Sequence, residues 1–115
     1  MKVLFAHRFL PGQLVHVARA LAADPGNEVV ALFEQDQGEP PVPGLRTVRV
    51  EPEKASGTAS HPFLSTLETQ VRSGTAAYRA CAVLRAEGFL PDVMVAHAGS
   101  GPGLYLRDAF PATAA

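Results

Sequence analysis

Short runs of apolar residues, separated by long helical patterns, constrain the fold of this chain more than any other feature of its sequence. Residues 3–6, 29–33 and 93–96 are continuously apolar, which is typical of strands covered on both faces in a parallel sheet. Residues 46–50 alternate polar and apolar side chains, which predicts a half-buried strand nearer an edge of the sheet. The sequence therefore predicts about four strands.

Two of the connecting segments have helical spacing. The first helix is predicted over residues 13–23, and its apolar positions are Leu14, Val17, Ala18 and Leu21. The second begins at residues 61–62 and ends before Gly88, with Pro62 in its first turn. Its recurring positions are Leu64, Leu67, Val71, Gly74, Tyr78, Cys81 and Arg85. We expect the glycine in mid-helix to allow a close contact or to mark a bend.

The elements follow one another in the order β-α-β-β-α-β-α, with crossovers long enough to make parallel neighbours. This order predicts an α/β fold, the first half of a Rossmann-like, doubly wound parallel sheet with strand order 3-2-1-4. Four strands are few for such a sheet, and the sequence stops shortly after Pro111. We therefore expect a truncated part of a larger protein.

Composition narrows the class of protein further. The 115 residues suit one domain, and 47% hydrophobic residues can form a core. The net charge of −1 gives no argument for binding nucleic acid or an anionic membrane. The longest apolar run is far shorter than the ~20 residues of a membrane span. The single cysteine, Cys81, is expected to be a small buried hydrophobe. We expect a cytoplasmic protein.

Two loops are candidate ligand sites, because open α/β sheets bind ligands beyond the carboxyl ends of their strands. Residues 7–13 meet the start of the first helix, whose free N–H groups can hold an anion or a hydroxyl. Gly12 would let a ligand approach the backbone there. Residues 97–103 form the second loop, and His97, at the end of a strand, is a stronger candidate than His7. For each of these residues a purely structural role is the alternative.

Several enzyme classes are excluded by motif. The first loop lacks the G-x-G-x-x-G fingerprint of dinucleotide-binding proteins, and the chain has no P-loop. Its four histidines lack metal-ligand spacing. Ser100 does not have the G-x-S-x-G context of a nucleophile elbow. His16 is expected to be solvated, and His61 is at least as well placed to cap a helix as to contact a ligand.

Three stretches together resemble family 4 glycosyltransferases. Residues 3–13 are similar to the opening strand and loop of that family, and residues 18–32 to its next helix and strand. Residues 88–99 are similar to its fourth strand and the following loop. His61 and Pro62 also fit. The resemblance covers essentially the whole chain, although each stretch alone is a weak signal.

The resemblance implies a GT-B enzyme with two Rossmann-like domains that face each other across a cleft. Residues 1–115 would be the N-terminal, acceptor-side domain, without the donor-binding C-terminal domain. The complete enzyme would be hexosyltransferase-like and would move a sugar from a nucleotide-sugar donor to a hydroxyl acceptor, with retention. It would need no metal ion and no other cofactor. The 115 residues alone would be inactive.

The resemblance also assigns roles to individual residues. His97 would lie near the reacting sugar as the catalytic residue. Gly12 would lie beside the donor diphosphate and the acceptor. The other predicted substrate-binding residues are Gln13, His7 and Gly99.

Two alternatives from other classes stay open on the sequence alone. One is a small nucleotide-binding domain of the universal-stress type, because its loop after the fourth strand is superficially similar to residues 95–100. The other is a non-catalytic α/β interaction module. In a truncated sheet that lacks a fifth strand, the uncovered strand at residues 93–96 would favour self-association as a dimer.

Overall fold

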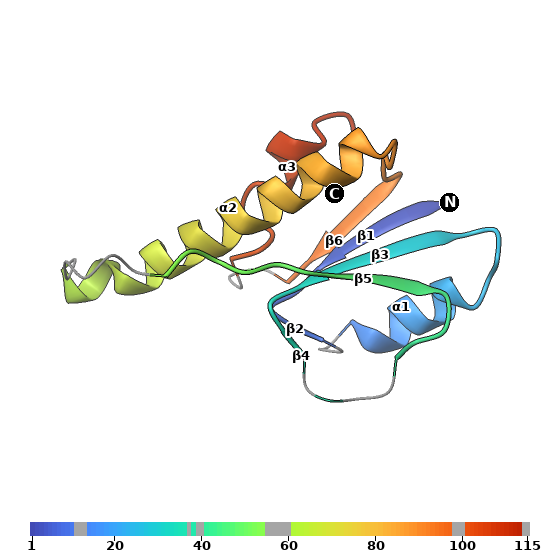
Figure 1. The fold of residues 1–115 in the computed structure, drawn as a ribbon, viewed down its shortest axis with the longest axis horizontal. Coiled ribbons are helices and arrows are strands. Elements are labelled where there is room, and N and C mark those ends of the chain that lie inside the picture. The colour runs from blue at the N-terminus through green and yellow to red at the C-terminus, as the bar shows by residue number, and fades with distance from the viewer. Residues whose placement is uncertain (11–13, 37, 39–40, 55–60, 98–100, 114–115) are drawn as a thin grey trace.

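Four parallel strands form the main sheet (Figure 1). The computed structural model describes residues 1–10, 14–36, 38, 41–54, 61–97 and 101–113. Within them, the sheet contains β1 (Lys2–Ala6), β3 (Glu28–Phe33), β5 (Leu45–Arg49) and β6 (Val93–Ala96). Their spatial order is β5-β3-β1-β6, which is the predicted order 3-2-1-4 once two very short strands are set aside. The predicted α/β class and strand order are confirmed.

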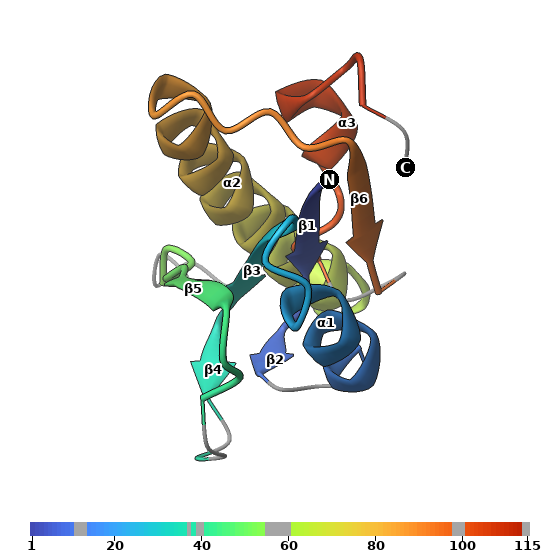
Figure 2. The ribbon, with the colours of Figure 1, turned by 90° about the vertical axis from the view of Figure 1, so that its right-hand side faces the viewer.

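Helices cover both faces of this sheet. Helix α1 (Val15–Ala22) lies on one face, while α2 (Ser65–Ala86) and the short α3 (Leu106–Ala109) lie on the other (Figure 2). In β1, Val3 and Phe5 pack in the core on the α1 side, and Leu4 packs in the core on the α2 side. Because successive side chains of a strand point to opposite faces, both sets must be apolar, which explains the continuous apolar runs.

The central strand β1 pairs with one strand from the early part of the sequence and one from the late part. Val3 pairs with Val29 of β3 on one side and with Val93 of β6 on the other. At the amino ends of these strands the backbone N–H of Asp92 donates to the carbonyl of Lys2 at 2.7 Å. The backbone N–H of Lys2 in turn donates to the Asp92 carboxylate, also at 2.7 Å.

A second, two-stranded sheet lies just past the carboxyl ends of β1 and β3. Its strands are β2 (Phe9–Leu10) and β4 (Gln35–Asp36), which pair in parallel. The sequence analysis did not predict them, because two residues are too few to show a periodic pattern. Through β2 and β4, the segments that follow β1 and β3 stay side by side beyond the main sheet.

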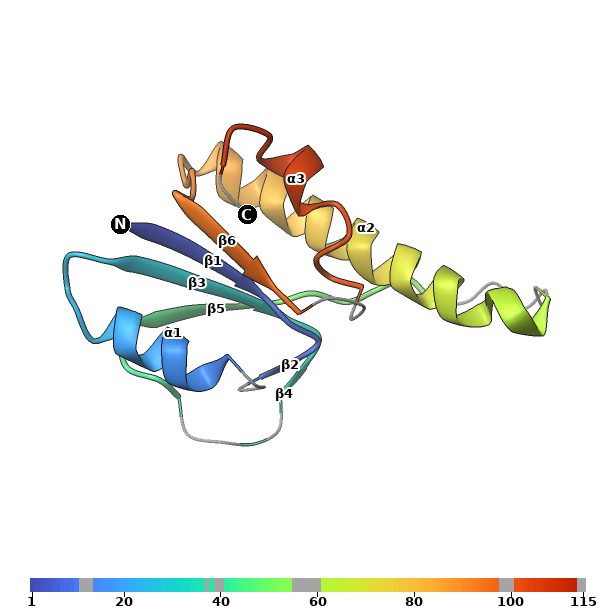
Figure 3. The same ribbon diagram turned by 180° about the vertical axis from the view of Figure 1, so that it is seen from behind.

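Helix α2 corrects one prediction. Its buried residues are Ser73, Gly74, Ala77, Cys81 and Leu84, so burial begins only at its ninth residue. The predicted apolar positions Leu64, Leu67, Val71 and Tyr78 are exposed. For Leu64, Leu67 and Val71, Figure 3 shows the physical reason: the part of α2 before Ser73, with the 3-10 helix η1 (Pro62–Leu64) before it, extends beyond the sheet. Phe63 in η1 is 90% exposed.

Two smaller expectations also differ from the structure. Val17 of α1 is exposed, and the sheet is contacted instead through the small residues Ala18 and Ala22. In β6 only Met94 is fully buried, while Ala96 is exposed. Among the described strands, β6 lies at an edge of the sheet, so it is covered less completely than its apolar sequence suggests.

Candidate functional site

The carboxyl ends of the strands bring polar side chains from distant parts of the sequence to one edge of the sheet. His7 and Arg8 follow β1, Glu34 follows β3, and His97 follows β6. Because β1 lies in register between β3 and β6, these four residues gather near the middle of the edge. This is the place where open α/β sheets bind their ligands.

The two histidines that the sequence singled out lie together. The ring centroids of His7 and His97 are 5.2 Å apart, with an interplanar angle of 69°, an edge-to-face arrangement. The backbone fixes both positions: the N–H of His97 donates to the carbonyl of Ala6, and the N–H of His7 to that of Leu32. His97 is exposed and His7 is half-buried. The pair therefore presents imidazole nitrogens at the surface of the edge.

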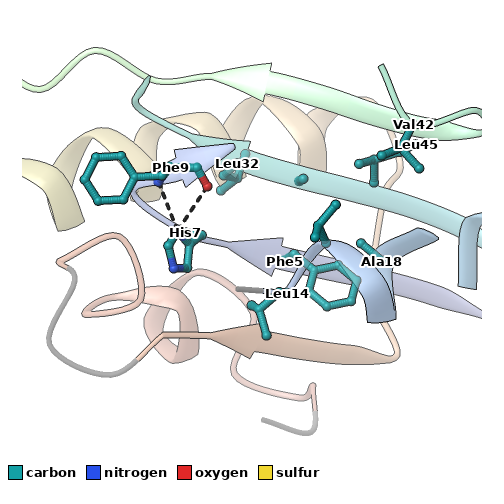
Figure 4. A pocket seen from close by; sticks show the side chains of 10 residues that line it. Phe5, His7, Phe9, Leu14, Ala18, Leu32, Val42 and Leu45 are labelled. Carbon is teal, nitrogen blue, oxygen red and sulfur yellow. Dashed lines mark hydrogen bonds between the residues drawn. The ribbon is translucent and has the colours of Figure 1, made fainter. Parts of the chain in front are cut away.

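The turn after β1 orients the ring of His7. Its Nδ1 lies 3.0 Å from the backbone nitrogen of Phe9 and 3.0 Å from the Phe9 carbonyl oxygen (Figure 4). One neutral tautomer accepts the N–H through Nδ1 and carries its proton on Nε2, whereas a ring protonated at Nδ1 donates to the carbonyl. His7 thus has a backbone partner in either tautomer, which holds its ring in place.

The pocket behind His7 is too small for a substrate. Phe5, Leu14 and Ala18 surround it between the sheet and α1 (Figure 4). Its volume is about 20 Å³, room for roughly one water molecule. A sugar ring does not fit, so this pocket is a packing gap in the core. The candidate site is the exposed edge itself.

A larger cleft opens on the α2 side of the same edge. Its volume is about 630 Å³, and charged and hydroxyl side chains from the loops after β1, β3 and β5 and from α2 line it. Arg8 and Glu34 form an ion pair there, with Arg8 Nε 3.6 Å from Glu34 Oε2. Among the described residues, Glu34 is the one charged residue that is buried. The sequence did not indicate either residue, because a single charge after a strand forms no pattern.

Glycines in the loop after β6 serve close packing. A Cβ on Gly101 would lie 2.8 Å from the Cβ of Ser73 in α2, and Gly101 has a φ of 88°. A Cβ on Gly103 would lie 2.7 Å from the Cβ of Ala96. Both contacts are shorter than carbon atoms allow, so these glycines hold the loop against β6 and α2.

The remaining predicted residues divide into three groups. Gly12, Gln13 and Gly99 lie outside the described residues, so their roles stay predictions. His61 caps η1, where its Nδ1 accepts the N–H of Phe63 at 3.2 Å. His16 is exposed on α1. Neither of these two histidines approaches the edge through an interaction seen in the described part of the chain.

Cys81 is not a candidate nucleophile. Its side chain is fully buried in the core between α2 and the sheet. Desolvation raises the pKa of its thiol to about 12, so the thiolate is scarcely populated at neutral pH. Within the described ranges, no three His, Cys, Asp or Glu side chains are arranged to hold a metal ion.

A comparison with protein families decides what kind of protein this is. Residues 25–115 match the model described as the glycosyl transferase family 4 group. The chain belongs to that glycosyltransferase group. The matched region of the glycosyltransferase domain includes Glu34 and His97, and begins after His7 and Arg8. No curated protein and no solved structure gives a significant match.

The predicted resemblance to family 4 glycosyltransferases is therefore confirmed. Membership indicates glycosyl transfer in general, with a sugar donor and an acceptor as substrates. A membrane-crossing helix, which would need a long apolar stretch, is not found in the described parts of this glycosyltransferase chain.

Proposed function

We propose that this domain forms the acceptor side of a two-domain, GT-B glycosyltransferase. The enzyme would transfer a hexosyl group from a nucleotide-sugar to a hydroxyl acceptor, with retention at the anomeric carbon. A second, donor-binding domain would face the carboxyl edge of the sheet. The match of residues 25–115 to the glycosyltransferase family is the observation that carries this proposal. The two alternatives drawn from the sequence, a universal-stress domain and an interaction module, predict no such match.

The histidine pair supplies the chemistry that such a site needs. During transfer, the acceptor oxygen bonds to the anomeric carbon, the nucleoside diphosphate leaves with the electrons of the old bond, and its leaving oxygen takes up the proton of the acceptor hydroxyl. His97 is placed on the exposed side of the pair, where a hydrogen bond from its ring can orient the reacting sugar. His7 lies behind it, held by the Phe9 backbone.

The candidate residues Gly12, Gln13 and Gly99 complete the proposal. They would carry the backbone of the two loops close to the substrates, with Gly12 beside the donor diphosphate. Diphosphate recognition would then rest on N–H groups at the start of α1 and on the donor domain. The proposed reaction needs no metal ion or other cofactor.

The test compares two histidine variants in the complete enzyme that contains this domain. UDP-, GDP- and ADP-linked hexoses would serve as donors, with release of nucleoside diphosphate as the readout. His97→Ala is expected to lower turnover about 10²-fold or more, the size of a lost transition-state hydrogen bond. His16→Ala, an exposed histidine on α1, should leave turnover unchanged.

Thermal unfolding provides the control for this comparison. His97→Ala should unfold near the wild-type temperature, since His97 is exposed and contributes little to the core. Normal turnover per folded molecule, combined with a much lower unfolding temperature, would show that His97 has a structural role only. The 115-residue chain alone should show no turnover, because it supplies one side of the site.

A further inference from the structure

The Arg8–Glu34 pair in the open cleft has properties that a structural ion pair does not need. The Glu34 side chain is 7% exposed, so its carboxylate is almost completely removed from water. Arg8 is anchored on its other side by Phe9, whose ring centroid lies 5.9 Å from the guanidinium carbon. A buried carboxylate is unfavourable unless its oxygens are hydrogen-bonded.

The backbone holds both residues of the pair in fixed positions. The N–H of Glu34 and the N–H of Gln35 both donate to the carbonyl of Arg8, at 3.1 and 3.0 Å. The carbonyl of Glu34 accepts a hydrogen bond from Arg49 Nε at 3.3 Å. The loops after β1, β3 and β5 are thus joined at Glu34, and the two side chains start from a rigid frame.

Despite this frame, the pair is incompletely bonded. The distance of 3.6 Å between Arg8 Nε and Glu34 Oε2 exceeds that of a charge-assisted hydrogen bond, about 2.7–2.9 Å. Arg8 Nε and the other carboxylate oxygen, Glu34 Oε1, are both buried without a hydrogen-bond partner. Such groups are rare in folded proteins, and each would gain a hydrogen bond from a polar partner.

The two unmet requirements define the chemistry of that partner. Arg8 Nε offers an N–H and needs an acceptor, while Glu34 Oε1 needs a donor. A phosphate would accept from the arginine, but its negative charge would be repelled by the carboxylate, and an ammonium group would satisfy only the glutamate. A hydroxyl group satisfies both, since it accepts and donates at the same oxygen.

We propose that Arg8 and Glu34 form a hydroxyl-binding subsite for a sugar or polyol. Thr69 and Ser73 of α2 line the same cleft. The subsite rests on the proposed function in one respect: it would hold a non-reacting hydroxyl of the acceptor. The cleft, at about 630 Å³, has room for a whole sugar ring.

The subsite and the histidine pair lie on opposite sides of one turn. His7 lines the gap on the α1 side, and its neighbour Arg8 lines the cleft on the α2 side. The two residues follow β1 directly, and the chain bends at Arg8. An acceptor with several hydroxyls can therefore reach the histidines while Arg8 and Glu34 hold another part of it.

The experiment is an NMR titration of the isotope-labelled 115-residue chain with three neutral probes. The probes are methyl α-glucopyranoside, methyl α-mannopyranoside and myo-inositol, and inorganic phosphate serves as the anion control. At least one neutral probe should shift the backbone amides of Arg8, Glu34 and Gln35 and the Arg49 Nε–H signal. Phosphate should leave them in place.

Two double variants separate recognition from folding. Arg8→Met/Glu34→Met removes both polar groups and should abolish the shifts of the remaining reporters, Gln35 and Arg49. Replacing a buried ion pair by apolar residues is often neutral for stability. The control is Arg46→Met/Glu87→Met, which removes an exposed pair of 2.9 Å and should keep all shifts. If the first variant fails to fold, Glu34→Gln, which keeps the shape, should weaken binding at least tenfold.

Three results would overturn the subsite. The first is the absence of any shift at about 100 mM probe, a concentration far above the millimolar dissociation constants of weak ligands. The second is an equal shift with phosphate, and the third is full binding by the variants. The outcome is independent of the transferase assay. If the complete enzyme transfers sugar but this cleft binds no probe, only the subsite is disproved. If the cleft binds a probe but the enzyme transfers no sugar, the proposed function is disproved.

Discussion

Gly74 of α2 and Gly101 of the loop after β6 face each other in a contact that leaves no room for a side chain. A Cβ on Gly74 would lie 3.1 Å from the carbonyl oxygen of Gly101. A Cβ on Gly101 would lie 3.2 Å from the Cα of Gln70, also in α2. The contact fixes the second half of the loop that begins at His97. The glycine expected in mid-helix to allow a close approach does so.

Gly74→Ala tests this contact. Alanine is the better helix former by about 1 kcal/mol, but its methyl group would meet Leu104 and Tyr105 at 3.0 Å. Overpacking commonly costs about 1–3 kcal/mol, so we expect a net loss of free energy of unfolding in urea. Thr66→Ala, on the exposed part of the same helix, should instead be neutral or stabilising. A stabilised Gly74→Ala would show that the loop moves freely away from α2.

The two halves of α2 should respond very differently to the same substitution. Leu84 is 1% exposed and packs in the core, whereas Leu67 is 54% exposed. Leu84→Ala should lower the free energy of unfolding by about 2–5 kcal/mol, because it leaves a cavity. Leu67→Ala should change it by less than about 0.5 kcal/mol. Equal losses, measured by chemical denaturation, would mean that the first half of α2 is covered in solution.

Cys81 should make stability depend on pH in the alkaline range. Burial raises the pKa of its thiol from 9.0 to about 12, so between these values the unfolded chain loses a proton that the folded chain keeps. The free energy of unfolding should therefore fall as pH rises through this window, by at most about 1.4 kcal/mol per unit. Below pH 9 the contribution is fully present.

Cys81→Ala removes this titration and isolates it from the tyrosines and lysines. The variant should be less stable than wild type at pH 7, because of the cavity, yet lose less stability between pH 9 and 11. In the native wild-type chain, thiol reagents should modify Cys81 only at the rate of unfolding. Parallel pH profiles for the two proteins would contradict the raised pKa.

Self-association of the 115-residue chain also stays a prediction. In the described sheet, β6 pairs with β1 on one side only, and an open edge strand favours pairing with a second copy. Light scattering at rising concentration should show a dimer. Leu67→Glu tests whether the exposed apolar side of α2 forms part of the dimer interface. A monomer at millimolar concentration would contradict self-association.

The strands and their order were predictable because the responsible physics is local or topological. A continuous run such as residues 29–33 records burial on both faces, and long crossovers favour right-handed parallel connections. The exposed half of α2 was not predictable in the same way. The spacing of Leu67 and Val71 indicates a helix, but it carries no information about whether anything covers that side.

The candidate site, like the fold, was predictable only in part. His7 and His97 were found because both end strands that the predicted order makes neighbours. Arg8 and Glu34 were not, because their pairing depends on the register of β1 and β3 and on the burial of one carboxylate. Neither the register nor the burial can be read from the sequence around a single charged residue. The structure supplies both.

The position of β1 has a consequence for how the chain is made. β1 is synthesised before the other described elements, whereas Asp92, the hydrogen-bond partner of Lys2, follows 90 residues later. At about 5–20 residues per second, translation takes roughly 5–20 s to deliver β6. Throughout that interval one side of an apolar strand has no native neighbour, which is when a nascent chain is most exposed to holdase chaperones and to misassembly with other polypeptides.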